Sequence, residues 1–158
     1  MNEEINKLIE KFEKRLQEVK EKYKKPEPEL RLTENYWYIN SAGRVFLDFW
    51  GNTSSEHKMY EIGNVFKTPD EASFEVEKRK VLHELKQLGR PFRTNESNFS
   101  ICLRHDSRDN QKRLFYKAMI EVDHAYGDYY FDSLPKAKDA VYRIGEERIM
   151  KYLFRAED

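Results

Sequence analysis

The stretch that decides the fold covers residues 66–89 and reads FKTPDEASFEVEKRKVLHELKQLG. It contains a full set of signals for the start and end of a helix. Thr68 is a good N-cap, Pro69 suits the first helical position, and Glu71 completes a capping box. Gly89 is typical of the position just beyond a helix C-terminus. The sequence therefore predicts one long helix between these two ends.

Two apolar stripes run along this predicted helix. The first comprises Ala72 and Val76 and is continued by His83. The second lies roughly opposite and comprises Phe74, Val81, Leu85 and Leu88. Because an amphipathic helix needs only one stripe to cover a core, the second stripe predicts a separate partner. The N-terminal segment is the candidate for that partner.

Residues 1–25 are predicted to form an amphipathic, coiled-coil-like helix, and residues 26–35 a linker that contains prolines. The apolar positions of the helix are spaced by four and three residues and are Ile5, Ile9, Phe12, Leu16, Val19 and Tyr23. Three partners remain open for residues 5–23: the protein's own domain, a second copy in a homodimer, or a foreign protein. A parallel homodimer would place Arg15 opposite Lys20 of the other chain, which is repulsive.

Residues 36–158 are predicted to form one α+β domain. Strands are expected where aromatic and β-branched residues alternate with others, at 36–39, 44–50, 59–62, 99–103 and 114–122. A second capped helix is expected after Ser133. Its predicted buried stripe comprises Ala137, Ala140, Val141 and Ile144.

The two halves of this domain are similar to each other. Two triplets share the same spacing: Phe66, Thr68 and Ala72, and Phe131, Ser133 and Ala137. This similarity predicts an internal repeat of 36–89 and 99–154, although strand-to-helix junctions also resemble one another for purely chemical reasons. The expected fold is α+β, with two strand–strand–helix units packed as a small antiparallel sheet with helices. The long N-terminal amphipathic helix precedes them.

Composition excludes several classes of protein. The 158 residues include 29 basic and 29 acidic side chains, so the formal net charge is zero. That balance argues against a uniformly basic nucleic-acid-binding protein, although a local basic patch stays possible. The mean hydropathy of −0.94 and the lack of a long apolar run predict no membrane partner. The single cysteine argues against a disulfide framework.

No set of residues indicates catalysis. The four histidines do not lie at ligand spacing from one another or from Cys102, and no phosphate-binding loop or nucleophile motif is present. A metal site built from two turns would require His105, Asp106, Asp123 and His124. A simple hairpin places these turns at opposite ends of one strand. We therefore expect a protein that is not an enzyme and that uses no cofactor or metal.

Several segments carry a resemblance to a known family. They are 36–41 with Gly43, then Trp50, 60–68, 71–72 and 80–86, and near the C-terminus 144–149 with 151–154. In these segments the chain resembles a family of small proteins encoded by phages, prophages and other mobile elements of Gram-positive bacteria. The resemblance implies an accessory protein of a mobile element in the cytoplasm of a bacterial host cell. It implies no activity and no functional residues.

Small proteins of mobile elements often bind and block host machinery, and anti-defence inhibitors such as anti-CRISPR proteins are one such class. By analogy, the main hypothesis is a protein that binds a host or defence protein and acts as its inhibitor. The candidate protein-binding residues are Trp50, Tyr126, Phe74 and Leu85. The alternative is a nucleic-acid-binding accessory protein that uses the 104–116 region. Its candidate residues are Arg104, Arg108, Lys112, Arg113 and Tyr116.

Overall fold

The computed structural model describes residues 2–23, 29–106, 111–119 and 129–156, and it confirms an α+β fold. The strands form two separate two-stranded antiparallel sheets, β1–β2 and β3–β4. In chain order the elements are α1 (Asn2–Lys22), β1 (Asn35–Ile39), β2 (Val45–Phe49), α2 (Ser54–Glu61), α3 (Pro69–Leu88), β3 (Asn98–Asp106), β4 (Gln111–Met119), α4 (Leu134–Ile144) and α5 (Glu146–Phe154).

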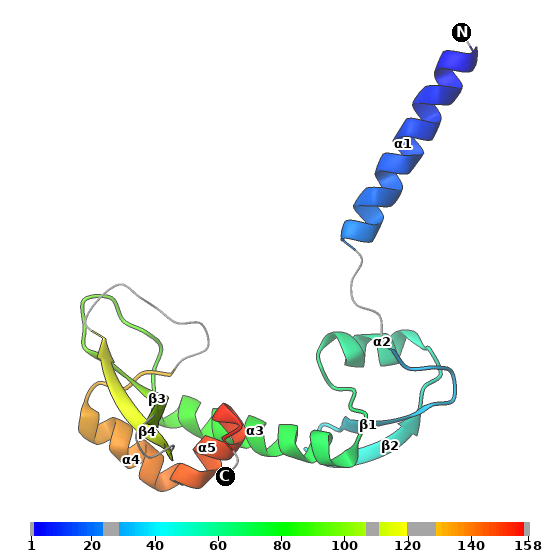
Figure 1. Ribbon diagram of the computed structural model, residues 1–158. Coiled ribbons are helices and arrows are strands. Elements are labelled where there is room, and N and C mark those ends of the chain that lie inside the picture. The colour runs from blue at the N-terminus through cyan, green and yellow to red at the C-terminus, as the bar shows by residue number, and fades with distance from the viewer. Residues whose placement is uncertain (1, 24–28, 107–110, 120–128, 157–158) are drawn as a thin grey trace.

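Helix α3 connects two lobes (Figure 1). It contacts β1 and β2 in one lobe, and α4 and α5 in the other. The predicted N-cap forms: the Thr68 hydroxyl accepts a hydrogen bond of 3.2 Å from the backbone N–H of Glu71, and Pro69 is the first helical residue. The predicted capping box does not form, because the Glu71 carboxylate accepts from the backbone N–H of Lys67 at 3.0 Å and not from that of Thr68. The helix ends at Leu88, and Gly89 donates its N–H to the Leu85 carbonyl at 2.7 Å. The helix predicted from residues 66–89 is confirmed.

The N-terminal lobe is built on the β1–β2 hairpin and α2. On the side of β1 away from β2, Trp37 and Phe66 exchange two backbone hydrogen bonds of 2.9 Å. Inside the lobe, Trp50 meets Tyr36 edge-on at 5.7 Å between ring centroids and His57 at 5.5 Å. These aromatic contacts give the small lobe a core of its own.

The prediction of a strand at 59–62 is wrong, because α2 covers most of that segment. The helix begins with a capping box at Thr53 and Glu56. The Glu56 carboxylate is buried and accepts hydrogen bonds from the N–H groups of Gly51 at 2.8 Å and Thr53 at 2.6 Å. This cap outweighs the strand preference of the short apolar run that follows it.

The C-terminal lobe contains the main hydrophobic core. Helices α3, α4 and α5 and the inner face of the β3–β4 hairpin supply its side chains. The predicted stripe of α4 is confirmed, since all four of its residues are buried: Ala137, Ala140, Val141 and Ile144. Gly145, with φ of 96°, separates α4 from α5, so the C-terminal segment folds back as a helical pair.

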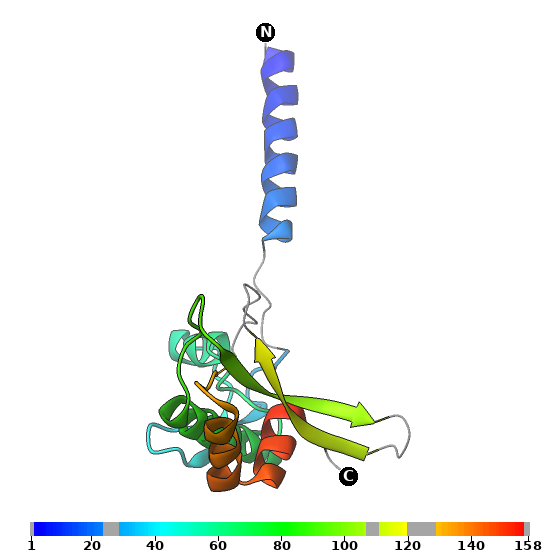
Figure 2. The ribbon, with the colours of Figure 1, turned by 90° about the vertical axis from the view of Figure 1, so that its left-hand side faces the viewer.

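Helix α5 covers the second stripe of α3, which was expected to bind the N-terminal helix. Val81 and Leu85 are buried in the core, and Phe74 packs against Tyr152 of α5 with ring centroids 5.1 Å apart. Arg148 of α5 forms a two-pronged ion pair with Glu84 of α3, at 2.9 and 3.1 Å. The expectation that α1 docks on α3 is therefore corrected. Figures 1 and 2 show α1 projecting away from both lobes.

The same junction occurs in both lobes. Phe66 pairs with β1 just before the cap of α3, and Phe131 pairs with Phe99 of β3 just before the cap of α4. The Ser133 hydroxyl accepts a hydrogen bond from the N–H of Lys136, as Thr68 does from Glu71. Across the described ranges, no helix has an apolar stretch that could span a bilayer.

Candidate binding surfaces

The predicted protein-binding residues do not form one surface. Trp50 is 2% exposed and Leu85 is 5% exposed, so neither side chain is available to a partner. Trp50 closes the aromatic core of the N-terminal lobe, and Leu85 belongs to the C-terminal core. Phe74 is half-buried on the middle of α3, and Tyr126 lies outside the described residues. Assigning Trp50 and Leu85 to an interface was therefore wrong.

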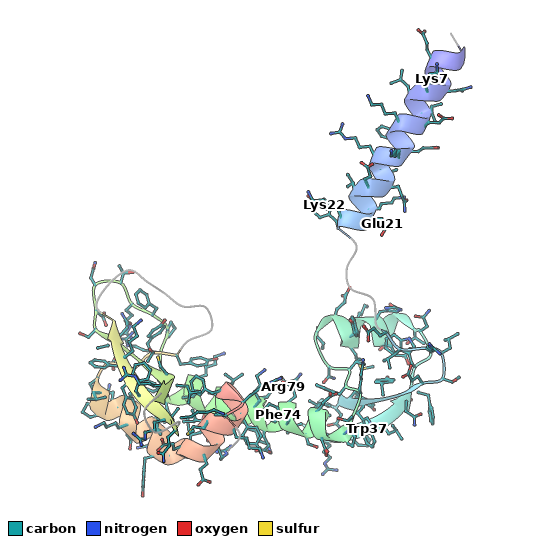
Figure 3. The ribbon with its side chains drawn as sticks, viewed as in Figure 1. Lys7, Glu21, Lys22, Trp37, Phe74 and Arg79 are labelled. Carbon is teal, nitrogen blue, oxygen red and sulfur yellow. The ribbon has the colours of Figure 1, made fainter. Side chains whose placement is uncertain are left out.

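The apolar face of α1 is exposed instead. Its side chains are between 45% and 72% exposed and comprise Ile5, Leu8, Ile9, Phe12, Leu16, Val19 and Tyr23. Leu8, which lies beside the heptad positions, widens the face. Figure 3 shows the side chains of α1, Lys7 and Glu21 among them, in a region that no other described element occupies. An exposed apolar face of this kind is a candidate interaction surface.

A second candidate surface lies on the outer face of the β3–β4 hairpin. Because strand side chains alternate between faces, the register places Arg104 opposite Arg113, and Cys102 opposite Phe115, on one face. Lys117 lies on the same face. We call this surface the basic hairpin face, defined by Arg104, Arg113, Phe115 and Lys117. The Arg104 guanidinium stacks over the Phe115 ring at 4.5 Å. Figure 2 shows the far end of the hairpin extending beyond the helices.

The same alternation assigns Tyr116 to the inner face. Tyr116 is half-buried and packs against the core, and Lys138 lies 6.0 Å from its ring centroid. Burial, together with Glu146, raises the pKa of its hydroxyl. Tyr116 therefore does not lie on the face that carries Arg104 and Arg113, whereas Phe115 does. Lys112 is exposed near the tip on the inner-face register, and Arg108 lies outside the described residues.

A cleft with three acidic side chains in its lining lies along the first two turns of α3. It has a volume of about 540 Å³ and is lined by Phe66, Asp70, Glu71, Phe74, Glu75 and Arg155. The Arg155 guanidinium lies 5.7 Å from the centroid of the Phe74 ring. The sequence pattern indicated only a capping role for Glu71, because nothing in it placed Arg155 near the start of α3.

Arg90 links three segments of the C-terminal lobe. Its side chain is 11% exposed and donates to Asp132, to the Asn98 side chain at 2.8 Å and to the Ser97 carbonyl at 3.0 Å. Hydrogen bonds from Lys136 and from Arg90 lower the pKa of Asp132 to about 2. These groups satisfy one another, so the cluster acts as a structural clamp.

The N-terminal lobe contains two perturbed ionisable groups. Burial first, then the charges of Asp48 and Glu56, raise the pKa of Tyr36 to about 12. Burial works to raise the pKa of Glu56, but hydrogen bonds from Gly51 and Thr53 outweigh it and the net shift is downward. Tyr36 therefore stays neutral and Glu56 stays charged at physiological pH, and neither is poised for proton transfer.

Metal ligands do not converge in the part of the chain that the structure describes: no three His, Cys, Asp or Glu side chains come together there as a metal site requires. The alternative set built on His105 and Asp106 includes Asp123 and His124, which lie outside the described residues.

No protein-family profile, no curated protein and no solved structure matches this chain.

Proposed function

We propose that this chain is a non-enzymatic binding protein that uses α1 to dock on a host or defence protein. The observation that supports the proposal is the exposed apolar face of α1. A helix that packs on nothing is held only by local interactions, and apolar side chains that stay in water gain nothing from folding. A partner that buries this face would stabilise both the helix and the complex.

The chemistry of α1 indicates what kind of partner would fit. An amphipathic helix typically inserts apolar anchors spaced by three and four residues into a hydrophobic groove. α1 contains six Glu and six Lys or Arg side chains, so its own charges cancel. We therefore expect the partner to present an apolar groove without a strong field of either sign. The resemblance to mobile-element proteins favours a host or defence protein as its owner, and blocking a functional groove would make the protein an inhibitor.

The test compares two matched variants in pull-downs from host lysate. Phe12→Ser with Leu16→Ser removes the centre of the apolar face, whereas Lys14→Ser with Gln17→Ser makes the same number of serine substitutions elsewhere on the helix. The proposal predicts that wild-type protein and the control retain the same host protein and that the apolar-face variant loses it. Equal retention by all three proteins would contradict it.

The basic hairpin face supports a second candidate function, binding of single-stranded nucleic acid. It combines three cations with an aromatic ring, which is the combination that contacts phosphates and stacks on bases. The test measures binding of mixed-sequence RNA and DNA as a function of salt concentration. Three phosphate contacts predict a log–log salt slope of about −2 on a single strand.

The matched variants for this test each remove three positive charges. Arg104→Gln, Arg113→Gln and Lys117→Gln change the basic hairpin face. The control comprises Lys58→Gln, Lys80→Gln and Lys86→Gln, three exposed positions on other elements. Loss of binding only in the first variant would support nucleic-acid binding. No binding by the wild-type protein at low salt would eliminate this candidate.

A further inference from the structure

The outer edge of β2 is an open strand edge. The backbone N–H and C=O groups of Trp37 in β1 both form hydrogen bonds with Phe66, so they point away from β2. Leu47 faces Trp37 in the register, so this is a non-hydrogen-bonded pair and the N–H and C=O groups of Leu47 point outward from the hairpin. Within residues 2–23, 29–106, 111–119 and 129–156, no strand pairs with this edge. Outward-pointing backbone groups of this kind are a template for another strand.

The side chains of β2 are unusual for an unprotected edge. Phe46, Leu47 and Phe49 are 43%, 45% and 60% exposed. β2 contains neither proline nor lysine, which are common means of blocking edge-to-edge pairing. Arg44, immediately before the strand, and Asp48 are both exposed, and the Asp48 carboxylate accepts a hydrogen bond of 2.8 Å from the backbone N–H of Phe49. The strand therefore presents apolar side chains together with one charge of each sign.

We propose that β2 pairs antiparallel with β2 of a second copy of this chain, about a two-fold axis at Phe46. In this register Phe46 faces Phe46 of the second copy. Val45 and Leu47 face each other across the axis and exchange backbone hydrogen bonds, since both point outward. The two hairpins then form one four-stranded sheet.

Charge complementarity favours this register and favours a second copy of the chain as the partner of β2. With the axis at Phe46, Arg44 of each chain faces Asp48 of the other, so the interface contains two pairs of opposite charges. Moving the axis to Leu47 places Arg44 opposite Trp50, and moving it to Val45 places Arg44 opposite Phe46. Only the axis at Phe46 pairs opposite charges. The heptad face of α1 offers no such match in a parallel dimer, because Arg15 would face Lys20 there.

The first test is disulfide crosslinking of the full chain, with Cys102→Ser as the background. Residues opposite each other in a non-hydrogen-bonded antiparallel pair have Cα atoms about 4.5 Å apart, within the range of about 4.4–6.8 Å that a disulfide spans. Phe46→Cys is therefore expected to form a crosslinked dimer on mild oxidation. Leu47→Cys is the control and is expected not to crosslink, because it faces Val45 of the other chain. Crosslinking of Leu47→Cys alone, or of neither variant, would overturn the proposal.

The second test follows the dimer by sedimentation equilibrium. Arg44→Asp or Asp48→Arg alone places like charges opposite each other, and each is expected to weaken dimerisation about tenfold. The double variant Arg44→Asp with Asp48→Arg restores complementarity and is expected to restore the dimer. A wild-type protein that stays monomeric at all concentrations would contradict the proposal. A dimer whose affinity is unchanged by these charge substitutions but lost in the Phe12→Ser, Leu16→Ser variant would also contradict the proposal, because that result assigns the interface to α1.

Discussion

Helices α1 and α3 show the same kind of apolar periodicity but have opposite environments. The second stripe of α3 is covered by α5, and Val81 and Leu85 lie in the core. The stripe of α1 stays in solvent. Spacing therefore predicts which residues share a helix face, whereas the element that covers the face depends on the rest of the chain. If the two faces differ energetically as they differ in exposure, substitutions on them have unequal effects on stability.

The largest effect is expected for truncation of the face that covers α3. Ile149 of α5 is fully buried, so Ile149→Ala is expected to destabilise the protein by about 3 kcal/mol. The same substitution at Ile9 of α1 removes little buried area and is expected to cost below about 0.5 kcal/mol. Urea denaturation of both variants measures the two values. Similar losses of unfolding free energy at the two positions would mean that α1 also packs against one of the lobes.

A smaller effect is expected for Glu56. Its folded-state pKa is lowered, so its carboxylate stabilises the fold above the unfolded value of about 4.3, and that contribution is lost as pH falls through the folded value. Glu56→Gln is expected to lower the free energy of unfolding by about 1 kcal/mol at neutral pH. It is also expected to make the free energy of unfolding depend less on pH in the acidic range. Thermal unfolding from neutral to acidic pH measures both changes.

The matched control for this experiment is Glu13→Gln, which changes the same group on α1, whose apolar face is exposed. It is expected to leave the stability curve unchanged. An equal loss of pH dependence in both variants would contradict the distinction between the N-terminal lobe and α1.

The ion pair between Arg148 and Glu84 is expected to contribute less. Both side chains are about one-third exposed, with fractions of 37% and 35%, so solvent screens the interaction. Arg148→Met keeps most of the apolar stem and is expected to cost about 0.5–1 kcal/mol. Urea denaturation of this variant, of Glu84→Gln and of the double variant measures the coupling. Additive losses would show that the pair does not link α5 to α3.

The smallest effect on stability is expected for the Phe12→Ser, Leu16→Ser variant that abolishes partner binding in the proposal. Its free energy of unfolding is expected to stay within about 0.5 kcal/mol of wild type, because these side chains are already in water. A loss above about 2 kcal/mol, measured by urea denaturation, would mean that the substitution breaks a core contact.

Local signals predicted the parts of the fold that local chemistry determines. Thr68 and Pro69 begin α3 as expected, and the small-residue stripe of α4 is buried as expected. The strand predicted at 59–62 is wrong because the capping box at Thr53 and Glu56 begins a helix that continues to Glu61. The short apolar run at 59–62 does not by itself indicate that helix.

The candidate sites were harder to predict because they depend on contacts between distant segments. Trp50 was predicted to bind a partner protein, yet Tyr36 and His57 pack against its ring inside the N-terminal lobe. Strand alternation alone separates Phe115 from Tyr116, but the sequence does not show which face meets the helices. The sequence showed the apolar face of α1 as a stripe. Only the structure shows that α5, and not α1, covers the second stripe of α3.

Amide hydrogen exchange on the unbound chain directly tests whether the apolar face of α1 is free to bind a partner. An exposed α1 with no tertiary partner is expected to exchange within about tenfold of the unprotected rate. The amides of α3 around Val81 are expected to exchange only through opening of the core, orders of magnitude more slowly. Protection of α1 comparable with that of α3 in the unbound protein would show that its apolar face is already covered, and would contradict its availability to a partner.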